Sequence, residues 1–268
     1  MIRDGLRYLA LALAGLAGGM ASLPGAARAE TEVDLALVLA VDISFSMDLD
    51  EQELQRTGFM EALRSSVVHD AIARGMLGRI AVTYAEWAGN FEQRVIVPWT
   101  ILDTPQSALA FADRLAQTPP RRAQRTSISG AIDMGARLLA ESGVVALRQV
   151  IDVSGDGPNN QGRPVTAARD EAVAKGITIN GLPIMLKRPG YLDIGDLDGY
   201  YADCVIGGVG SFTVPVRDRA QFPSAIKTKI IMEVAGLTPP APLLHKAQGT
   251  PRANCLIGEQ QWRDRMGN

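Results

Sequence analysis

The sequence VDLALVLAVDISFS, residues 33–46, joins an apolar run directly to three oxygen-bearing side chains. The apolar part, residues 33–41, is typical of a strand buried on both faces of a parallel sheet. Asp42, Ser44 and Ser46 follow it at alternate positions. In an open α/β sheet, ligands bind beyond the carboxyl ends of the strands, and carboxylate and hydroxyl oxygens are ligands that Mg²⁺ accepts. This stretch therefore predicts a parallel sheet with a candidate cation site at its edge.

The N-terminal segment has the features of a secretory signal peptide, predicted to span residues 1–29. Charged residues precede an apolar stretch at 9–16, and the small-residue sequence Ala27-Arg28-Ala29 provides a cleavage site. An uncleaved membrane anchor is the alternative, but glycines and prolines interrupt the apolar run well before the roughly 20 residues that a span requires. We therefore expect a periplasmic or secreted protein with no stable membrane insertion after cleavage. The remaining chain is long enough for one domain with its own core.

The rest of the chain alternates apolar runs with helical periodicity, which predicts an α/β fold with a mostly parallel central sheet and helices on both faces. Turn-forming residues 88–90 separate two strand-like runs and predict a hairpin, and so one antiparallel edge strand that accommodates Pro98. We expect the domain to span residues 30–236 and the Pro- and Ala-rich tail at 237–268 to be extended. The expected strands cover residues 33–41, 79–87, 93–101, 147–153, 177–184 and 212–216, and the expected helices cover residues 50–74, 104–117, 129–141, 166–175 and 222–234.

The first of these helices has its own start signal and apolar face. Asp50 can cap its N-terminus. Met60, Leu63, Val67 and Ala71 recur at helical spacing and predict the side that packs on the sheet.

Charge and cysteine content limit the class of protein. The chain has 27 Lys and Arg against 29 Asp and Glu, so a nucleic-acid-binding protein is disfavoured. The two cysteines, Cys204 and Cys255, both lie in the part expected to be exported. An oxidising compartment allows a single bridge between them. Buried free thiols are the alternative reading.

Two further loops bring oxygen-bearing residues to the same edge of the expected sheet. Thr126 ends a basic loop that contains Arg121, Arg122 and Arg125, and Asp156 follows a buried strand. A carboxylate bound at this edge would meet the arginine charges. Each site residue also has a structural alternative, because serines commonly supply turns, Thr126 can cap the next helix and Asp156 can be a turn residue.

Neighbouring polar and aromatic residues are expected to have supporting roles. Asp152 lies inside the expected strand, so we expect it to stand behind the metal ligands or to be a buried partner for a loop amide. Ser127 and Ser129 are expected to be helix caps, and Trp87 to pack in the core. For Glu86 two roles stay open: hydrogen bonding to a loop, or a contribution to the electrostatics of the site.

The three loops, in this order, resemble a von Willebrand factor type A domain with a metal-ion-dependent adhesion site. The shared pattern is Asp-x-Ser-x-Ser, then a Thr before a helix, then an Asp in a Gly-flanked turn, over about residues 33–234. The resemblance implies that Ser44, Ser46 and either Thr126 or Asp156 contact Mg²⁺ or Mn²⁺ directly, and that the remaining Asp groups act through water. It also implies an open coordination position for an Asp or Glu of a protein partner. The expected metal residues are therefore Asp42, Ser44, Ser46, Thr126 and Asp156.

The chain also resembles, more narrowly, the exported bacterial proteins of the family DUF1194, a branch of that superfamily. The stretches that carry this resemblance are YAEW at 84–87, RTSISGAI at 125–132, DVSGDG at 152–157 and CVIGG at 204–208. Membership of that family implies a fold and a metal site, but no assigned activity.

Catalytic readings have less support. The turn at 155–157 resembles a loop of haloacid-dehalogenase-type phosphatases, but Ser44 replaces the Asp that acts as their general acid, and no Lys precedes Lys175. His69, on an expected helix, and His245, in the tail, are the only histidines, which disfavours a Ser/His/Asp triad or a His-ligated zinc site. We therefore predict a divalent-cation-dependent protein-binding module and not an enzyme. A metal-free structural envelope domain is the alternative.

Overall fold

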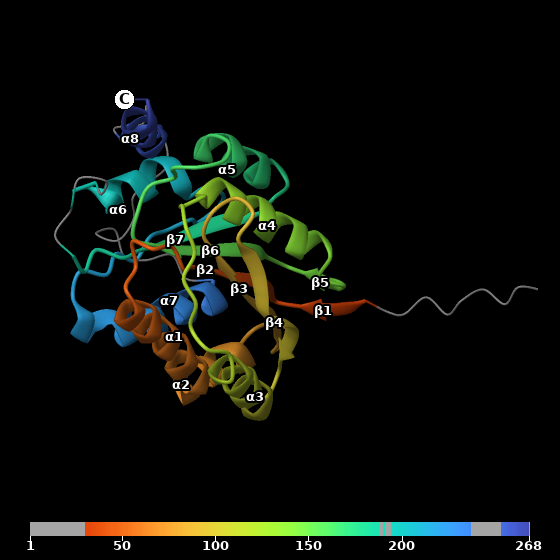
Figure 1. The fold of residues 1–268 in the computed structure, drawn as a ribbon. Helices are drawn as coiled ribbons and strands as arrows, with labels where there is room; N and C mark the ends of the chain where they lie inside the picture. The colour runs from red at the N-terminus through yellow and green to blue at the C-terminus, as the bar shows by residue number, and fades with distance from the viewer. Residues whose placement is uncertain (1–29, 188–189, 191–193, 237–252, 268) are drawn as a thin grey trace, which may run out of the picture.

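The apolar run that opens the domain forms the centre of a five-stranded sheet (Figure 1). The computed structural model describes residues 30–187, 190, 194–236 and 253–267, so the expected signal peptide lies outside it. The strand order is β4-β3-β2-β6-β7, and only the β3–β4 pair is antiparallel. The strands are β2 (Leu35–Asp42), β3 (Ile80–Trp87), β4 (Gln93–Leu102), β6 (Gln149–Gly155) and β7 (Thr178–Pro183). The predicted mostly parallel sheet with one antiparallel edge strand is confirmed.

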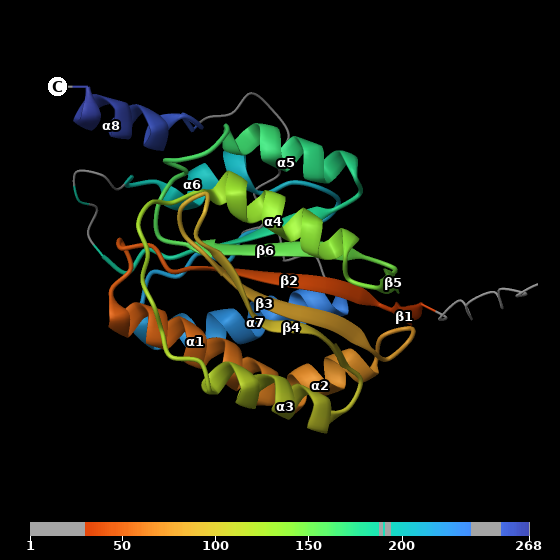
Figure 2. The same ribbon diagram turned by 45° about the vertical axis from the view of Figure 1, so that its right-hand side comes forward.

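Helices cover both faces of this sheet, as the edge-on view in Figure 2 shows. On one face lie α1 (Leu49–Arg64), α2 (Ser66–Ala73), α3 (Pro105–Ala116) and α7 (Phe222–Ala235), which the short 3₁₀-helix η2 (Arg219–Gln221) precedes. On the other lie α4 (Ile128–Ala140), α5 (Val165–Ala174), the short α6 (Leu197–Tyr200) and the π-helix η1 (Tyr201–Val205). A small parallel pair, β1 (Thr31–Val33) with β5 (Val144–Ala146), extends the amino end of β2.

The alternation of side chains along β2 explains why the sheet needs both layers. Leu35, Leu37 and Leu39 belong to the core under α1, α3 and α7, whereas Ala36 and Val38 belong to the core under α4 and α5. Successive side chains of a strand point to opposite faces, so a continuous apolar run is stable only between two covering layers. The two alanines of β2, Ala36 and Ala40, are both on the α4 and α5 side.

The long helix expected at 50–74 is two helices. Asp48, not Asp50, caps α1: its side chain accepts a hydrogen bond from the Glu51 N–H, and the Glu51 side chain accepts one from the Asp48 N–H. The chain breaks at Ser65, which lies between α1 and α2 in an extended conformation. This break rotates the predicted face, so that Val67 is 54% exposed, while Val68 and Ile72 are buried in its place.

Two other expectations change in the C-terminal part of the chain. Residues 212–216 form no strand but only single bridges, of Thr213 with Gly181 and of Val216 with Ile184. The expected extended tail contains the helix α8 (Ile257–Met266), and its residues 237–252 lie outside the described part. The expected bridge between Cys204 and Cys255 is present.

Both edges of the sheet are irregular. On β4, Pro98 interrupts the row of edge N–H groups, and the pairing with β3 shifts register around Tyr84. On β7, single bridges from Gly207, Thr213 and Val216 cover the outer edge.

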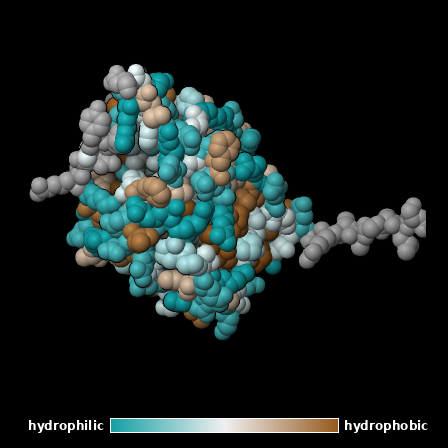
Figure 3. All heavy atoms as spheres, in the orientation of Figure 1, coloured by the Kyte–Doolittle hydropathy of each residue, from teal (hydrophilic) through white to brown (hydrophobic). Residues whose placement is uncertain are grey.

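The face of the domain drawn in Figure 3 is mostly hydrophilic. On the face drawn in Figure 3, hydrophobic side chains lie in small separate groups, which is ordinary for a protein surface. Within the described ranges, the helices are all too short or too polar to cross a membrane.

A buried ionic cluster joins β6 to α7. The Lys229 Nζ lies 2.8 Å from Asp152 Oδ1 and 2.5 Å from Glu233 Oε1, and all three side chains are buried. Asn180 on β7 donates a further hydrogen bond to Glu233. Asp152 therefore faces α7, and the expectation that it bonds a loop amide is wrong. Burial, and then the charge of Glu233, raises the pKa of Asp152 to about 7.

Candidate metal centre

The predicted site lies where the order of the strands reverses. From β2 the chain continues to β3 on one side, whereas β6 lies on the other side of β2 and continues to β7. In doubly wound sheets this switch point opens a crevice beyond the carboxyl ends of the two central strands. Asp42 is the last residue of β2, and Asp156 directly follows the last residue of β6.

A chain of short contacts links four of the five predicted metal residues. Asp42 Oδ1 accepts a hydrogen bond from the Ser44 N–H at 2.6 Å. The hydroxyl oxygens of Ser44 and Ser46 are 2.8 Å apart, and the Ser46 hydroxyl donates to Asp156 Oδ1 at 2.5 Å. The structure thus brings the first and third loops together as the sequence predicted.

Asp42 is the most constrained of these residues. It is fully buried, and its Oδ2 has no hydrogen-bond partner within the described part of the chain. Burial, and then the nearby charge of Asp156, raises the pKa of Asp42 well above its usual range. A buried carboxylate beside a second one is destabilised unless a cation compensates it.

The donor set fits a hard divalent cation. Carboxylate and hydroxyl oxygens converge here, and Mg²⁺ binds such oxygens while keeping some of its own waters. Among the described residues, no cluster of three or more Asp, Glu, His or Cys side chains could hold a metal ion. A metal at this site would therefore need the hydroxyls of Ser44 and Ser46 as well as the two carboxylates.

Gly155 and Tyr201 complete the floor of the site, and the sequence analysis missed both. A Cβ at position 155 would lie 2.8 Å from Asp42 Oδ2 and 2.9 Å from the Tyr201 hydroxyl oxygen, so only glycine leaves room for the two groups. Burial, and then the charge of Asp42, raises the pKa of Tyr201, which keeps its phenol neutral. The Gly-Asp-Gly sequence gave a signal for Gly155, whereas Tyr201 is distant in sequence and gave none.

Thr126, the fifth predicted residue, is tied to both neighbouring loops through the backbone. Its N–H donates to Asn160 Oδ1 at 2.9 Å, and its carbonyl oxygen accepts from the Asn160 N–H at 2.8 Å. Three residues earlier, the Ala123 N–H donates to the Ile43 carbonyl oxygen at 2.9 Å. The Thr126 side chain is buried in this loop. Asn160 thus positions Thr126, a role that the sequence analysis did not assign.

The residues around Thr126 divide into caps and ion pairs. Ser127 caps α4, as expected, whereas Ser129 lies inside the helix. Buried Glu86 pairs with Arg56 of α1 and, at 3.4 Å, with Arg121. Glu86 therefore ties the basic loop to α1.

The remaining arginines of the basic loop contact aromatic rings. The Arg122 guanidinium lies over the exposed Phe45 ring at 5.2 Å, and Phe45 stands between Ser44 and Ser46 in the sequence. Arg121 is paired with Glu86 and Glu92. The expected rim of free positive charge is therefore smaller than the sequence suggested, because Arg121 is neutralised locally.

A hollow of about 250 Å³ opens beside the site. Ser46 and Asp156 form one wall, and aliphatic side chains, including Ile184 and Leu197, form another. Lys187 lies at its lining and is paired with Glu51. The hollow is large enough to admit a side chain next to Ser46 and Asp156.

Comparison with known proteins identifies the family and the fold of the chain. A family model described as "Protein of unknown function (DUF1194)" matches residues 32–238, from β1 to just beyond α7. The chain belongs to the DUF1194 family. A search of curated proteins finds no match to this DUF1194 chain.

Solved structures show that the DUF1194 domain has the von Willebrand factor type A fold. One is proximal thread matrix protein 1 from the mussel byssus with a zinc-occupied MIDAS motif, at a TM-score of 0.53 and 13% identity over 77% of this chain and 49% of that chain. Another is a von Willebrand factor type A protein from Catenulispora acidiphila, with a TM-score of 0.52 and 13% identity over 75% of this chain and 43% of that chain. A third is the vWF domain of the type V pilus tip protein Mfa5 from Porphyromonas gingivalis, with a TM-score of 0.51 and 12% identity over 78% of this chain and 97% of that chain. The DUF1194 chain thus spans about half the length of the first two chains, and these likenesses concern the fold.

Proposed function

We propose that this protein is an exported binding module that holds one Mg²⁺ or Mn²⁺ ion and, through it, a carboxylate of a partner protein. The residues that would hold the ion are Asp42, Ser44, Ser46, Thr126 and Asp156. The observation that carries the proposal is the buried Asp42 Oδ2, which lacks a hydrogen-bond partner within the described residues, in a crevice shared with two hydroxyls and a second carboxylate. When bound, the ion would supply an open coordination position to an Asp or Glu of the partner.

The binding role is favoured over a catalytic one by the kinds of group present. The crevice combines carboxylates with hydroxyls, and His69 lies on α2, where its Nε2 is 2.7 Å from the Leu63 carbonyl oxygen. His245 lies outside the described residues. The zinc-occupied MIDAS motif named for the mussel protein, which shares this fold, supports divalent-metal binding, and the pilus tip protein Mfa5 supports a role in contact between macromolecules. The proposed location is the periplasm or the medium.

Calorimetric titration of the mature protein with Mn²⁺ and Mg²⁺ tests the metal site. We expect a single site in the parent protein and its loss in Asp42→Ala, because this change removes the carboxylate at the base of the crevice. Asp50→Ala, which removes an exposed carboxylate at the start of α1, is the matched control and should bind like the parent. At a metal concentration of about 100 times Kd, binding should add roughly 2.7 kcal/mol to the free energy of unfolding, visible as a chelator-sensitive Tm. A parent protein that binds neither ion would leave the structural envelope domain as the better reading.

The partner is tested by capture from envelope extract with and without chelator. A protein that binds through the ion should be captured by the parent and by Asp50→Ala, but not by Ser44→Ala at any salt concentration. Capture that survives both the chelator and Ser44→Ala would show that the interaction does not run through the metal.

A further inference from the structure

The helix α8 stands apart from the family fold but adjoins the metal site. The DUF1194 model ends at residue 238, before α8 begins at Ile257. Figures 1 and 2 show α8 outside the two helical layers, at the end of the molecule where β2 and β6 have their carboxyl ends. Its described contacts join it to the loops that carry Thr126 and Asp156.

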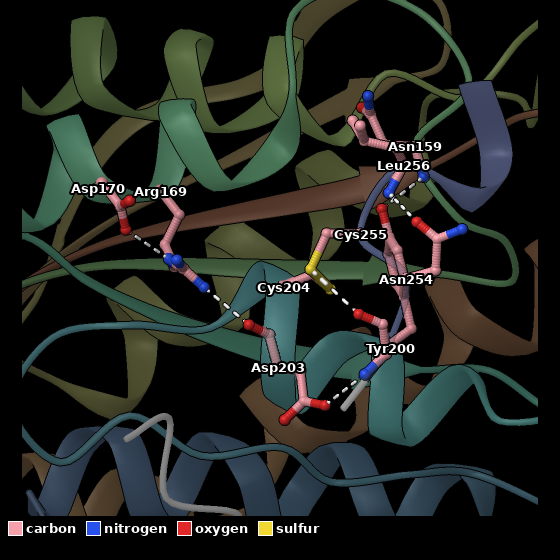
Figure 4. The surroundings of a disulfide bond; sticks show 10 residues. Asn159, Arg169, Asp170, Tyr200, Asp203, Cys204, Asn254, Cys255 and Leu256 are labelled. Atoms are coloured by element: carbon pink, nitrogen blue, oxygen red, sulfur yellow. Dashed lines mark hydrogen bonds and ion pairs between the residues drawn. A yellow bond between two sulfur atoms is a disulfide. The ribbon is translucent and has the colours of Figure 1, made fainter. Parts of the chain in front are cut away.

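A disulfide and a hydrogen bond anchor the start of this segment, as Figure 4 shows. Cys255 is bonded to the buried Cys204 of η1, with the two Cα atoms 5.5 Å apart. The Ala253 N–H donates to Asp203 Oδ2 at 2.8 Å. The bond therefore fixes the position from which α8 begins.

The first turn of α8 supports the turn after β6. The buried Asn159 side chain donates to Glu259 Oε1 at 2.7 Å, while its Oδ1 accepts from the Ser129 N–H at 3.0 Å. Gly258 packs directly on this turn, because a Cβ at position 258 would collide with the Asn159 carbonyl oxygen. Asn160, the next residue, makes the two hydrogen bonds to Thr126.

The second turn of α8 supports the Thr126 loop from the other side. The Arg125 guanidinium carbon lies 3.6 Å from the ring centroid of Trp262, with Arg265 on the same ring at 5.3 Å. Arg125 has a φ of 73°, and it is the one non-glycine residue in the described part of the chain with a positive φ. This conformation is unfavourable for an L-residue and persists only when surrounding contacts hold it. The stacking of Arg125 on Trp262 is such a contact, and Arg125 directly precedes Thr126.

We propose that α8 is a clasp in which Glu259 and Trp262 are positioning residues for the metal site. Glu259 fixes the Asn159–Asn160 turn, Trp262 fixes the conformation of Arg125, and both therefore act on Thr126 without contacting the ion. The Cys204–Cys255 bond keeps the clasp in place, so metal affinity depends on the redox state of that bond. This inference rests on the proposed metal site, and it goes beyond it by assigning a role to a segment outside the family match.

Hydrogen exchange of the metal-free protein tests the clasp without any metal. The Thr126 and Asn160 amides are both hydrogen-bonded in the parent protein. We expect them to exchange about tenfold faster in Trp262→Ala, in Glu259→Ala and in the double variant Cys204→Ser with Cys255→Ser, because the loops then open locally. Arg263→Ala removes an exposed long side chain from the same helix and should leave both amides unchanged. Parent-like exchange in the double variant would overturn the clasp.

Mn²⁺ calorimetry on the same proteins tests the consequence for binding. Loss of a residue that orients a ligand typically weakens metal affinity by 10- to 100-fold, so we expect at least about a tenfold rise in Kd for Trp262→Ala and for the double variant. Trp262→Phe keeps an aromatic face for Arg125 and should recover most of the affinity. Parent-like Kd values in the variants would overturn the role of α8 but leave the metal site standing. A parent protein that binds no Mn²⁺, and so does not differ from Asp42→Ala, would overturn the metal site and with it any effect of α8 on affinity.

Discussion

Asn160 offers a direct way to test whether Thr126 is a metal ligand. Its Oδ1 accepts the Thr126 N–H at 2.9 Å, and its own N–H donates to the Thr126 carbonyl oxygen at 2.8 Å. Asn160→Ala removes the first bond and keeps the second, because the second uses only the backbone. The change therefore leaves the Thr126 N–H buried without its acceptor and frees the loop to shift.

The size of the effect follows from that single bond. Leaving a buried donor unpaired costs about 1–3 kcal/mol. Removing a residue that orients a metal ligand costs about 10- to 100-fold in affinity, or roughly 1.4–2.7 kcal/mol. The two estimates agree, so we expect the Kd for Mn²⁺ to rise by about 10- to 100-fold in Asn160→Ala. The same rise should appear in Thr126→Val, which removes the hydroxyl.

Calorimetry of the two single variants and the double variant decides the matter. If Asn160 acts only through Thr126, the double variant should bind no more weakly than Thr126→Val, because the two effects are not independent. Asn90→Ala, which removes an exposed amide from a neighbouring loop, should bind like the parent. Parent-like affinity in Asn160→Ala, or fully additive losses in the double variant, would refute the reasoning that Asn160 positions a ligand.

Two further predictions concern the stability of the metal-free protein. The pKa of Asp152 is about 7 in the folded state and 3.8 in the unfolded chain, so the folded state binds this proton more tightly. The stability that this proton contributes is therefore present at low pH and is lost as the pH rises through about 7. The free energy of unfolding by urea, parent minus Asp152→Asn, should therefore fall by up to about 4 kcal/mol between about pH 4 and pH 8; a flat difference would contradict a buried, proton-binding Asp152. The Cys204–Cys255 bond spans a sequence separation of 51, so replacing both cysteines with serine should lower the free energy of unfolding by up to about 4 kcal/mol when α8 unfolds together with the domain. An unchanged urea midpoint would show instead that α8 detaches independently.

The central part of the site could be predicted because its signals are local. The run at 35–41 is continuous and apolar, which predicts a strand covered on both faces, and Asp42, Ser44 and Ser46 follow it within a few residues. Asp156 likewise directly follows a buried strand. Residues within a few positions of a strongly apolar strand are placed by that strand, so contacts with distant parts of the chain have little influence on where they lie.

Predictions failed where distant residues decide the structure. Asp152 faces Lys229 of α7, and no pattern near Asp152 indicates that partner. Val67 is exposed because the chain breaks at Ser65, which an unbroken apolar period does not reveal. The helix α8 was missed because its sequence is mostly polar; tertiary contacts such as the one between Trp262 and Arg125 hold it against the domain.

The two irregular edges of the sheet have a consequence for assembly. An open sheet can polymerise when a regular edge strand offers its unpaired N–H and C=O groups to another molecule. Here Pro98 and the register shift around Tyr84 disturb one edge, and the bridges from Gly207, Thr213 and Val216 occupy the other. Strand addition between copies is therefore unfavourable on both sides, even at high protein concentration. Copies of this chain can therefore lie side by side at high concentration without their sheets joining edge to edge, and the proposed metal crevice stays accessible.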